Sequence, residues 1–238
     1  MADRWMDSHR RDAWRRKSKD SGYRARSAFK LLQIQERFNI MRQGDVILDV
    51  GAHPGGWSQV AVESVGDAGF VVGVDLEPCE PIDGCTFIVG DVTEDEVQRK
   101  LVGCLDGRDV NTVVSDISPQ LTGNWVRDQI ISLQLVAMVF DFSLPLLTAG
   151  GNLVTKVFQG EGIENLIELV RPRFTNVRRH SPEASRKSSA EVFLVCRNHT
   201  PWRGTGYSIR KKLELSFDVG DESEPEPAAT GFRLHRAR

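Results

Sequence analysis

Short apolar runs alternate with amphipathic stretches through the middle of the chain. The runs are three to six residues long and rich in Val, Ile and Leu, as is typical of buried strands. The stretches between them space their apolar residues as a helix does, and Leu31, Ile34 and Phe38 fall at i, i+3 and i+7. This alternation predicts a mainly parallel sheet with crossover helices. The expected strands are 46–50, 70–74, 86–89, 112–114, 153–158 and 191–196, and the expected helices lie near 21–38, 57–65, 93–105, 125–147 and 161–171.

The two ends of the chain lack this alternation. Residues 1–20 mix Arg, Asp and Trp, and we expect a basic flexible arm there. Residues 218–231 are acidic, rich in Pro and poor in large apolar side chains, a composition that cannot bury enough surface to order itself. We therefore expect one folded domain over 21–205 and a largely disordered C-terminal tail over 206–238.

Composition excludes several classes of protein. With 40% hydrophobic residues, the chain is globular and can form one sizeable core. No window holds about 18 uninterrupted apolar residues, and the charged N-terminus has no apolar signal segment. We therefore expect a cytoplasmic protein without a membrane span. The four cysteines form no C-x-x-C pair and have no nearby His ligand set, so we expect reduced thiols and no metal.

Charge is divided unevenly along the chain, although the net charge is only -2. Residues 1–43 hold 12 basic and 5 acidic side chains, and residues 171–212 hold 11 basic and 2 acidic. Between them, residues 44–170 hold 5 basic and 20 acidic. Two basic blocks around an acidic middle indicate a polyanionic partner. The first block includes Arg15, Arg16, Lys17, Lys19, Arg24 and Arg26, and the second includes Arg171, Arg173, Arg178, Arg179, Arg186 and Lys187.

A glycine-rich turn follows the first expected strand, in VILDVGAHPGGW over 46–57. Gly51 and Gly55 would let a ligand approach the backbone closely, because glycine has no Cβ. The spacing is not G-x-G-x-x-G, and Pro54 removes an amide donor that a pyrophosphate would use. Asp49 ends the strand with a carboxylate, which suits a cationic ligand better than a phosphate. The turn therefore disfavours a dinucleotide.

Acidic residues also end the next two expected strands. Asp75 comes 24 residues after Gly51, a spacing at which an acid can accept both hydroxyls of a ribose. Asp91 ends the following strand at the same edge of the sheet. Acids around an adenosine pocket fit S-adenosylmethionine, which carries a sulfonium, an ammonium and a ribose diol. The alternative is a glycine turn with surface carboxylates that bind no ligand.

Four further residues converge on this edge. Asp116 follows the strand at 112–114, and Glu191 opens the last strand, whose start reaches the same edge if the strand is antiparallel. Lys30 could come over the edge from the N-terminal helix. Lys156 lies inside an apolar strand, where a lysine is costly unless it is paired or functional. Lys156 is therefore either part of a structural ion pair with Asp116 or Glu191 or a catalytic group, and the alternative for Lys30 is a solvated helix face.

The same residues lie in motifs that resemble the RrmJ/FtsJ (RlmE) family of S-adenosylmethionine-dependent ribosomal RNA ribose 2′-O-methyltransferases. The resemblance covers residues 18–198 and rests on RARSAFKLLQI, LDVGAHPGGWSQV, SDISP, VTKVFQGEG and SSAEVFLV. It implies a Rossmann-like fold with a mainly parallel seven-stranded sheet, an antiparallel last strand and helices on both faces. It also implies a catalytic tetrad of Lys30, Asp116, Lys156 and Glu191, with Lys156 as the base. The cofactor contacts that it implies come from Gly55, Trp57, Asp75, Asp91 and Asp116. From the glycine-rich turn itself, we add Asp49 and Gly51 to these contacts.

By this resemblance, the reaction is methyl transfer from S-adenosylmethionine to an RNA ribose 2′-hydroxyl. The implied target is a uridine of 23S-type ribosomal RNA, and the implied partner is this RNA or the large subunit. Lysine accepts a proton only when neutral; Lys30 would favour that form of Lys156, whereas Asp116 and Glu191 would oppose it. His53 stands where the family usually has a small residue, and we interpret it as a tolerated loop variant. We expect a monomer.

Other functions stay compatible with the sequence. One is a tRNA or mRNA-cap 2′-O-methyltransferase with the same chemistry. Another is a non-catalytic RNA-binding factor for ribosome assembly on the same fold. A nicotinamide-dependent dehydrogenase is disfavoured by the spacing of the glycine loop and by Pro54.

Overall fold

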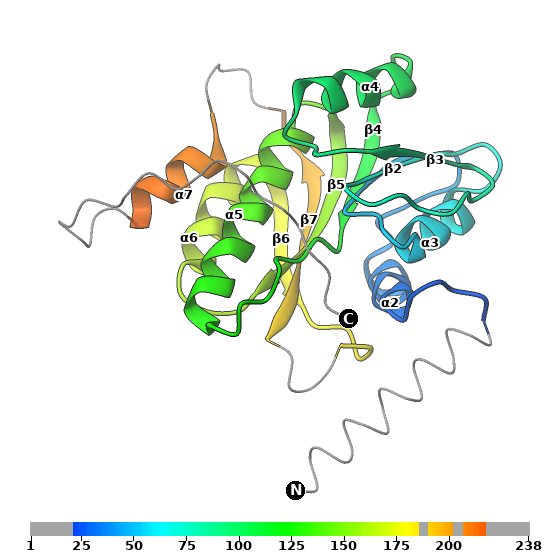
Figure 1. The fold of residues 1–238 in the computed structure, drawn as a ribbon. Helices are drawn as coiled ribbons and strands as arrows, with labels where there is room; N and C mark the ends of the chain where they lie inside the picture. Colours follow the sequence, from blue (N-terminus) through cyan, green and yellow to red (C-terminus); the bar gives the residue numbers. More distant parts are fainter. Residues whose placement is uncertain (1–20, 186–189, 202–206, 218–238) are drawn as a thin grey trace, which may run out of the picture.

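The computed structural model describes residues 21–185, 190–201 and 207–217, which form a three-layer α/β fold (Figure 1). The central sheet has seven strands in the order β3-β2-β1-β4-β5-β7-β6. Neighbours from β3 to β5 are parallel, whereas β7 is antiparallel to both β5 and β6. The predicted Rossmann-like sheet with an antiparallel last strand is confirmed. The strands are β1 (Val46–Val50), β2 (Phe70–Asp75), β3 (Cys85–Val89), β4 (Val110–Ser115), β5 (Leu147–Phe158), β6 (Phe174–His180) and β7 (Glu191–His199).

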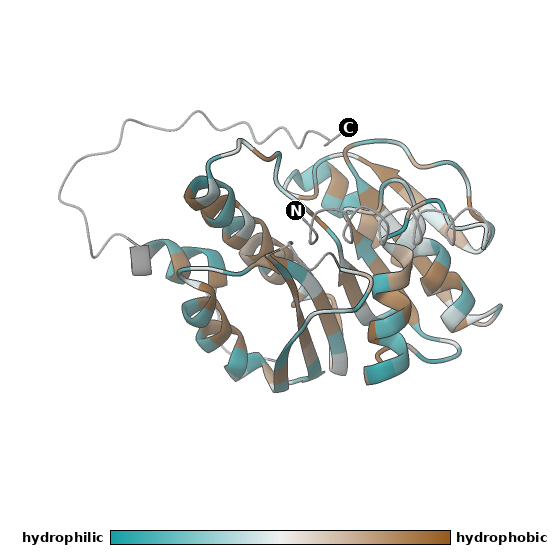
Figure 2. Ribbon diagram, turned by 90° about the horizontal axis from the view of Figure 1, so that it is seen from below, coloured by the Kyte–Doolittle hydropathy of each residue, from teal (hydrophilic) through white to brown (hydrophobic). Residues whose placement is uncertain are grey.

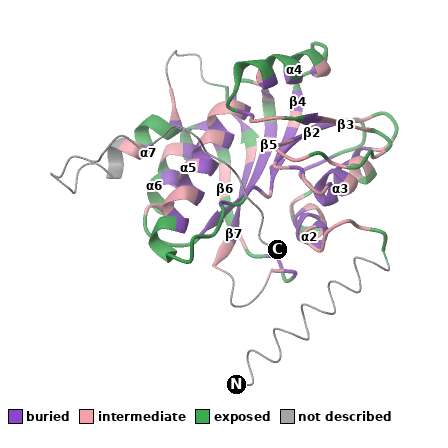
Figure 3. Ribbon diagram, viewed as in Figure 1, coloured by how far each residue is buried: buried purple, intermediate pink, exposed green. Residues whose placement is uncertain are grey.

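Helices cover both faces of the sheet because side chains alternate between its two sides. Ile47 belongs to the core under one layer of helices, whereas Leu48 belongs to the core under the other. Figure 2 shows apolar residues along the strands and on the inner sides of helices, and Figure 3 shows most of the sheet as buried. The first layer is α2 (Ala28–Phe38) and α3 (Gly56–Val65); the second is α4 (Asp95–Leu105), α5 (Trp125–Ser143), α6 (Ile163–Val170) and α7 (Ile209–Phe217), with the short 3-10 helix η1 (Arg171–Arg173).

Several element bounds differ from the expectation. The edge strand β6 is not among the expected strands, because five of its seven residues are polar or basic and only Phe174 is buried. The strand β5 starts at Leu147 rather than at 153. The first half was not predicted as a strand because two glycines interrupt its apolar pattern. Conversely, α5 ends at Ser143, because Pro145 has no N–H to continue the helix. Residues 21–27 are turns that lead into α2.

The folded domain continues beyond the predicted boundary at 205. The helix α7 packs on α5 and α6, and its Ile209 and Leu213 are 0% and 1% exposed. These two residues are four positions apart, so they share the buried face of the helix. The expected tail is therefore wrong for the residues of α7. The predicted arm over 1–20 and the acidic segment after 217 lie outside the described residues.

The sheet has one edge at which the candidate residues can meet. The parallel strands β1, β2, β3, β4 and β5 all end there. Because β7 is antiparallel to β5, it begins at that edge, and Glu191 pairs with Phe158 at the end of β5. No helix in the described part of the chain is long and apolar enough to cross a membrane.

Candidate active site

The loop between β1 and α3 requires glycine at two positions. Gly51 has a φ of 81°, and a Cβ there would lie 3.1 Å from the Cβ of Ile117. Gly55 has a φ of 104°, and a Cβ there would lie 2.9 Å from a guanidinium nitrogen of Arg24. Positive φ and close neighbours together exclude a larger residue. The amides in the first turn of α3, which have no partner within the helix, are therefore available to a ligand.

Arg24 connects this loop to the segment that follows β2 through hydrogen bonds. Its guanidinium donates to the carbonyl oxygens of Pro54 at 3.4 Å, Glu80 at 2.6 Å and Pro81 at 2.7 Å. Its backbone N–H donates to the side chain of Gln59 at 2.9 Å. Arg24 belongs to the first basic block, but the structure gives it these structural contacts. Sequence reasoning missed this role because the partners are carbonyl groups distant along the chain.

Trp57 faces away from the ligand side of the loop. Its side chain is 2% exposed, and its ring lies 5.7 Å from the ring of Phe193, centroid to centroid. Its indole N–H donates to the carbonyl oxygen of Ser27 at 2.9 Å. A cofactor contact at Trp57 can therefore be made only by its backbone amide, which lies in the first turn of α3.

A pocket opens beside this loop at the ends of β2 and β3. Its free space is about 660 Å³, including the part open to solvent. Asp75 and Asp91 lie in its wall as predicted, together with Gly51. Asp75 accepts the backbone N–H groups of His53 and Glu77 at 2.8 and 2.9 Å. The other side of the pocket is formed mainly by Val92, Ile117, Leu135 and Met138.

His53 is held by the loops rather than by the pocket. Its Nδ1 lies 3.0 Å from the carbonyl oxygen of Pro78, and its ring is not part of the pocket wall that the structure describes. This position agrees with the interpretation of His53 as a loop variant without a catalytic role.

Asp49 is fully buried beneath the loop. Its Oδ2 accepts the hydroxyl of Ser58 at 2.7 Å, and no described residue hydrogen-bonds to its Oδ1. It does not line the pocket, so the expected cofactor contact has no support in the structure. Burial raises the pKa of Asp49 to about 7; the Ser58 hydroxyl opposes this rise, and the carboxylates of Asp116 and Asp75 add to it.

This raised pKa predicts that Asp49→Asn changes how stability depends on pH. An unperturbed Asp titrates at 3.8, so between about pH 4 and 7 the folded protein keeps a proton that the unfolded chain has lost. The contribution of Asp49 to the free energy of unfolding therefore falls as pH rises, by up to about 4 kcal/mol. The free energy of unfolding of Asp49→Asn, relative to wild type, should therefore be higher at about pH 7.5 than at about pH 4.5. Denaturant unfolding at the two pH values measures this change. A difference that stays constant with pH would contradict the assignment.

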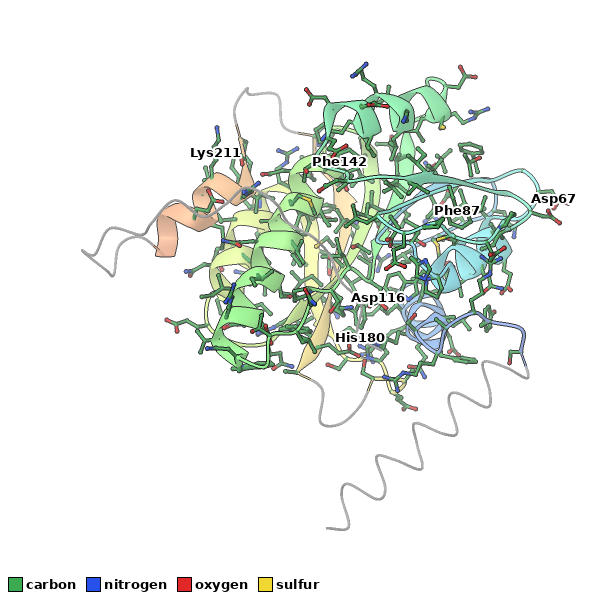
Figure 4. All side chains as sticks on the ribbon, viewed as in Figure 1. Asp67, Phe87, Asp116, Phe142, His180 and Lys211 are labelled. Atoms are coloured by element: carbon green, nitrogen blue, oxygen red, sulfur yellow. The ribbon has the colours of Figure 1, made fainter. Side chains whose placement is uncertain are left out.

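The four residues of the predicted tetrad meet as two ion pairs. The Nζ of Lys156 lies 3.0 Å from Oδ1 of Asp116 and 2.6 Å from the Asp116 carbonyl oxygen. The Nζ of Lys30 lies 2.5 Å from Oε1 of Glu191. Their side chains are only 7% to 18% exposed. Figure 4 labels Asp116, the member of the cluster that follows β4.

Asp116 interacts electrostatically with both lysines. Burial alone would raise the pKa of Asp116, but the charges of Lys156 and Lys30 and hydrogen bonds from Lys156 and Ser27 outweigh it. The pKa of Asp116 therefore lies below its ordinary value, and the group is a carboxylate at neutral pH. Ser27, just before α2, is a member of the cluster that sequence reasoning missed.

The cluster and the pocket are neighbours. Asp116 belongs to the cluster, and the next residue, Ile117, lies in the pocket wall. The backbone therefore connects the cluster directly to the pocket wall. Among the described residues, no group of three or more His, Cys, Asp or Glu could hold a metal ion.

Fold and site together define the class of protein. A dinucleotide-binding Rossmann sheet has the parallel order 3-2-1-4-5-6, whereas here the antiparallel β7 lies between β5 and β6. The pocket presents carboxylates at the strand ends, and a buried lysine cluster adjoins it. These features define a Rossmann-like methyltransferase. The chain belongs to the FtsJ-like methyltransferase family, whose sequence profile matches residues 23–199.

Similar proteins support this assignment. A protein of Alkalilimnicola ehrlichii named ribosomal RNA large subunit methyltransferase E is 42% identical over 194 residues, 82% of this chain and 93% of its own. A protein of the same name from Methanocaldococcus jannaschii is 40% identical over 201 residues, 83% and 82% of the two chains. A solved structure of a ribosomal RNA methyltransferase from Plasmodium falciparum has a TM-score of 0.69 at 26% identity, and covers 76% of this chain and 100% of its own.

Proposed function

We propose that this protein transfers a methyl group from S-adenosylmethionine to a ribose 2′-hydroxyl of RNA, with a uridine of large-subunit ribosomal RNA as the target. The observation that carries the proposal is the buried Lys156, whose Nζ is held by Asp116 beside the pocket. The shared name of the relatives supports ribosomal RNA as the substrate.

The pocket residues fit S-adenosylmethionine. Asp75 can accept the two ribose hydroxyls, and Asp91 can accept the adenine amino group. Val92, Ile117 and Leu135 offer apolar surface to a flat ring. The amides at the start of α3 can bind the carboxylate of the amino-acid part. When bound, this cofactor supplies an electrophilic methyl group on a sulfonium.

Lys156 is the general base in this proposal. In its neutral form, its Nζ can accept the proton of the 2′-hydroxyl as that oxygen attacks. Asp116 fixes the direction of Nζ through its carboxylate and its carbonyl oxygen. Lys30, paired with Glu191, interacts electrostatically with Asp116 and so belongs to the same cluster. Because the transfer needs an in-line geometry, fixing these groups contributes much of the rate.

Aromatic and basic side chains near the same edge suit single-stranded RNA. Trp125 is 50% exposed, and its ring stacks on that of Phe158, with 6.1 Å between centroids. Phe158 is two residues after Lys156 on β5, so both side chains leave the same side of the strand. An unstacked base on Trp125 would bring its ribose towards Lys156. Exposed arginines such as Arg178 can contact phosphates.

Two rival functions are less well supported. A nicotinamide-dependent dehydrogenase would bind a pyrophosphate, and the loop lacks the glycine spacing for it. A non-catalytic assembly factor would have no use for two buried lysine–carboxylate pairs next to a ligand pocket. A tRNA or mRNA-cap methyltransferase shares the chemistry and differs only in substrate.

The proposal predicts which RNA becomes labelled. With methyl-labelled cofactor, the purified protein should label large ribosomal subunits or their RNA far more than free tRNA. The label should lie on a uridine ribose, and the bond that follows should resist alkali because the 2′-oxygen can no longer attack the phosphate. Label on a base would contradict the reaction, and label on tRNA alone would contradict the substrate. Cofactor binding without any product would instead favour the assembly factor.

A further inference from the structure

The helix α7 adds a wall to the pocket that the family match does not include. The match ends at residue 199, and α7 begins at Ile209. Nevertheless, Arg210 in the first turn of α7 lines the pocket together with Asp75, Asp91 and Met138. A residue outside the matched region therefore lies next to the proposed cofactor.

Three hydrogen bonds fix the start of α7 on α5. The carboxylate of Asp141 accepts the hydroxyl of Ser208 at 2.6 Å, the N–H of Ile209 at 2.7 Å and the N–H of Arg210 at 3.1 Å. Such a carboxylate satisfies amides that would otherwise lack a partner at a helix start. The buried Ile209 and Leu213 hold the rest of the helix against the core. The backbone of Arg210 is thus held at a fixed place relative to α5.

The side chain of Arg210 is also oriented. Its Nε lies 3.0 Å from Oε1 of Glu214, one helical turn further along α7. Arg210 lines two hollows: the proposed cofactor pocket and a groove between α4, α5 and α7. Thr93 and Met138 also line both. Figure 4 labels Lys211 and Phe142, two other residues that line this groove. Arg210 therefore stands at the boundary between the pocket and the groove.

In the proposed binding mode, the adenine ring lies near Asp91 and Val92, and Arg210 lines the same pocket. The residues near Arg210 are Val92, Thr93 and Met138, which offer apolar surface and no cation. A guanidinium is planar, weakly hydrated and able to stack on an aromatic ring. A purine is the aromatic part of the cofactor.

We propose that Arg210 covers the adenine ring of bound S-adenosylmethionine and closes the pocket towards the groove. The inference rests on the proposed cofactor. It makes Arg210 a cofactor-binding residue and α7 part of the binding site. Asp141 and Glu214 are then positioning residues that act through Arg210.

Calorimetric binding of two probes tests the inference. S-adenosylhomocysteine contains the amino-acid part, and 5′-methylthioadenosine lacks it, but both contain adenine. Arg210→Ala should weaken the affinity for both probes by the same factor, about fivefold. Arg210→Lys should restore only part of it, because an ammonium does not stack as a guanidinium does. The matched control is Lys211→Ala, at the next position of the same helix, which should leave both affinities unchanged.

A double variant tests whether Asp141, which binds the start of α7, acts through Arg210. Asp141→Ala should weaken both probes by no more than Arg210→Ala does, and the double variant should weaken them no further than Arg210→Ala alone. Fully additive losses would contradict action through Arg210. Unchanged affinities in Arg210→Ala would overturn the inference, as would a loss for S-adenosylhomocysteine alone, since that places Arg210 at the carboxylate. If wild type binds neither probe, the proposed cofactor itself fails.

Discussion

Replacing Lys156 with alanine should reduce the rate of methyl transfer by at least about 10³-fold. The loss is expected because the 2′-hydroxyl then has no positioned base at the cluster. Affinity for the cofactor product should change by no more than about twofold, since Lys156 contacts Asp116 and is not part of the pocket wall. Single-turnover transfer to ribosomal RNA, together with calorimetry on the same preparation, measures both quantities.

Two further variants sharpen this test. Lys156→Arg keeps the positive charge next to Asp116, but a guanidinium does not give up its proton at neutral pH, so it should also be inactive. Lys100→Ala removes an exposed lysine paired with Glu96 on α4, far from the cluster in sequence, and should retain full activity. Near-normal turnover in Lys156→Ala or Lys156→Arg would contradict the role of Lys156 as the base.

Glu191→Ala should lower the free energy of unfolding by about 3–5 kcal/mol. The expected cost is large because it leaves the ammonium of Lys30, whose side chain is 7% exposed, without its 2.5 Å partner. Denaturant unfolding at neutral pH measures this change. Two weaker interactions of the Lys30 ammonium would remain: the ring of Phe193, 5.6 Å from Nζ, and the charge of Asp116, which is hydrogen-bonded to Lys156.

A double-variant cycle separates the interaction energy of Lys30 with Glu191 from the contributions of the two individual side chains. Lys30→Met combined with Glu191→Ala removes both charges, so the combined variant should be more stable than Glu191→Ala alone. If the double variant folds stably and still transfers methyl groups at the wild-type rate, the pair is structural only. A single variant that loses less than about 1 kcal/mol would contradict the buried pair itself.

The sequence indicated the fold and the position of most site residues because both depend on local patterns. Apolar runs that end in acids locate β1, β2 and β4, and the carboxyl ends of parallel strands share one edge. Asp75, Asp91 and Asp116 therefore lie where the spacing placed them. The position of Glu191 at this edge also followed from an antiparallel β7, which the structure contains, whereas its pairing with Lys30 was not predicted.

Other features depend on contacts that no local pattern encodes. The side chain of Trp57 points into the core, because the motif specifies its position but not its direction. Arg24 binds carbonyl groups of distant loops, and any residue type can supply a carbonyl. The helix α7 is short and follows a polar linker, so its two buried residues give only a weak periodic signal. Asp49 looked like a ligand group, but burial beneath the loop removes it from the pocket.

The antiparallel strand β7 also affects when the site can exist during synthesis. Lys30 and Glu191 are 161 residues apart, and the chain grows from its N-terminus. At about 5–20 residues per second, Glu191 is added roughly 8–32 seconds after Lys30. Throughout that interval, Lys30 lacks this carboxylate. A nascent chain that stops short of β7 therefore holds Lys30, Asp116 and Lys156 without Glu191, and it also lacks Arg210 in the pocket wall, so both the cluster and the pocket are completed by the C-terminal part of the fold.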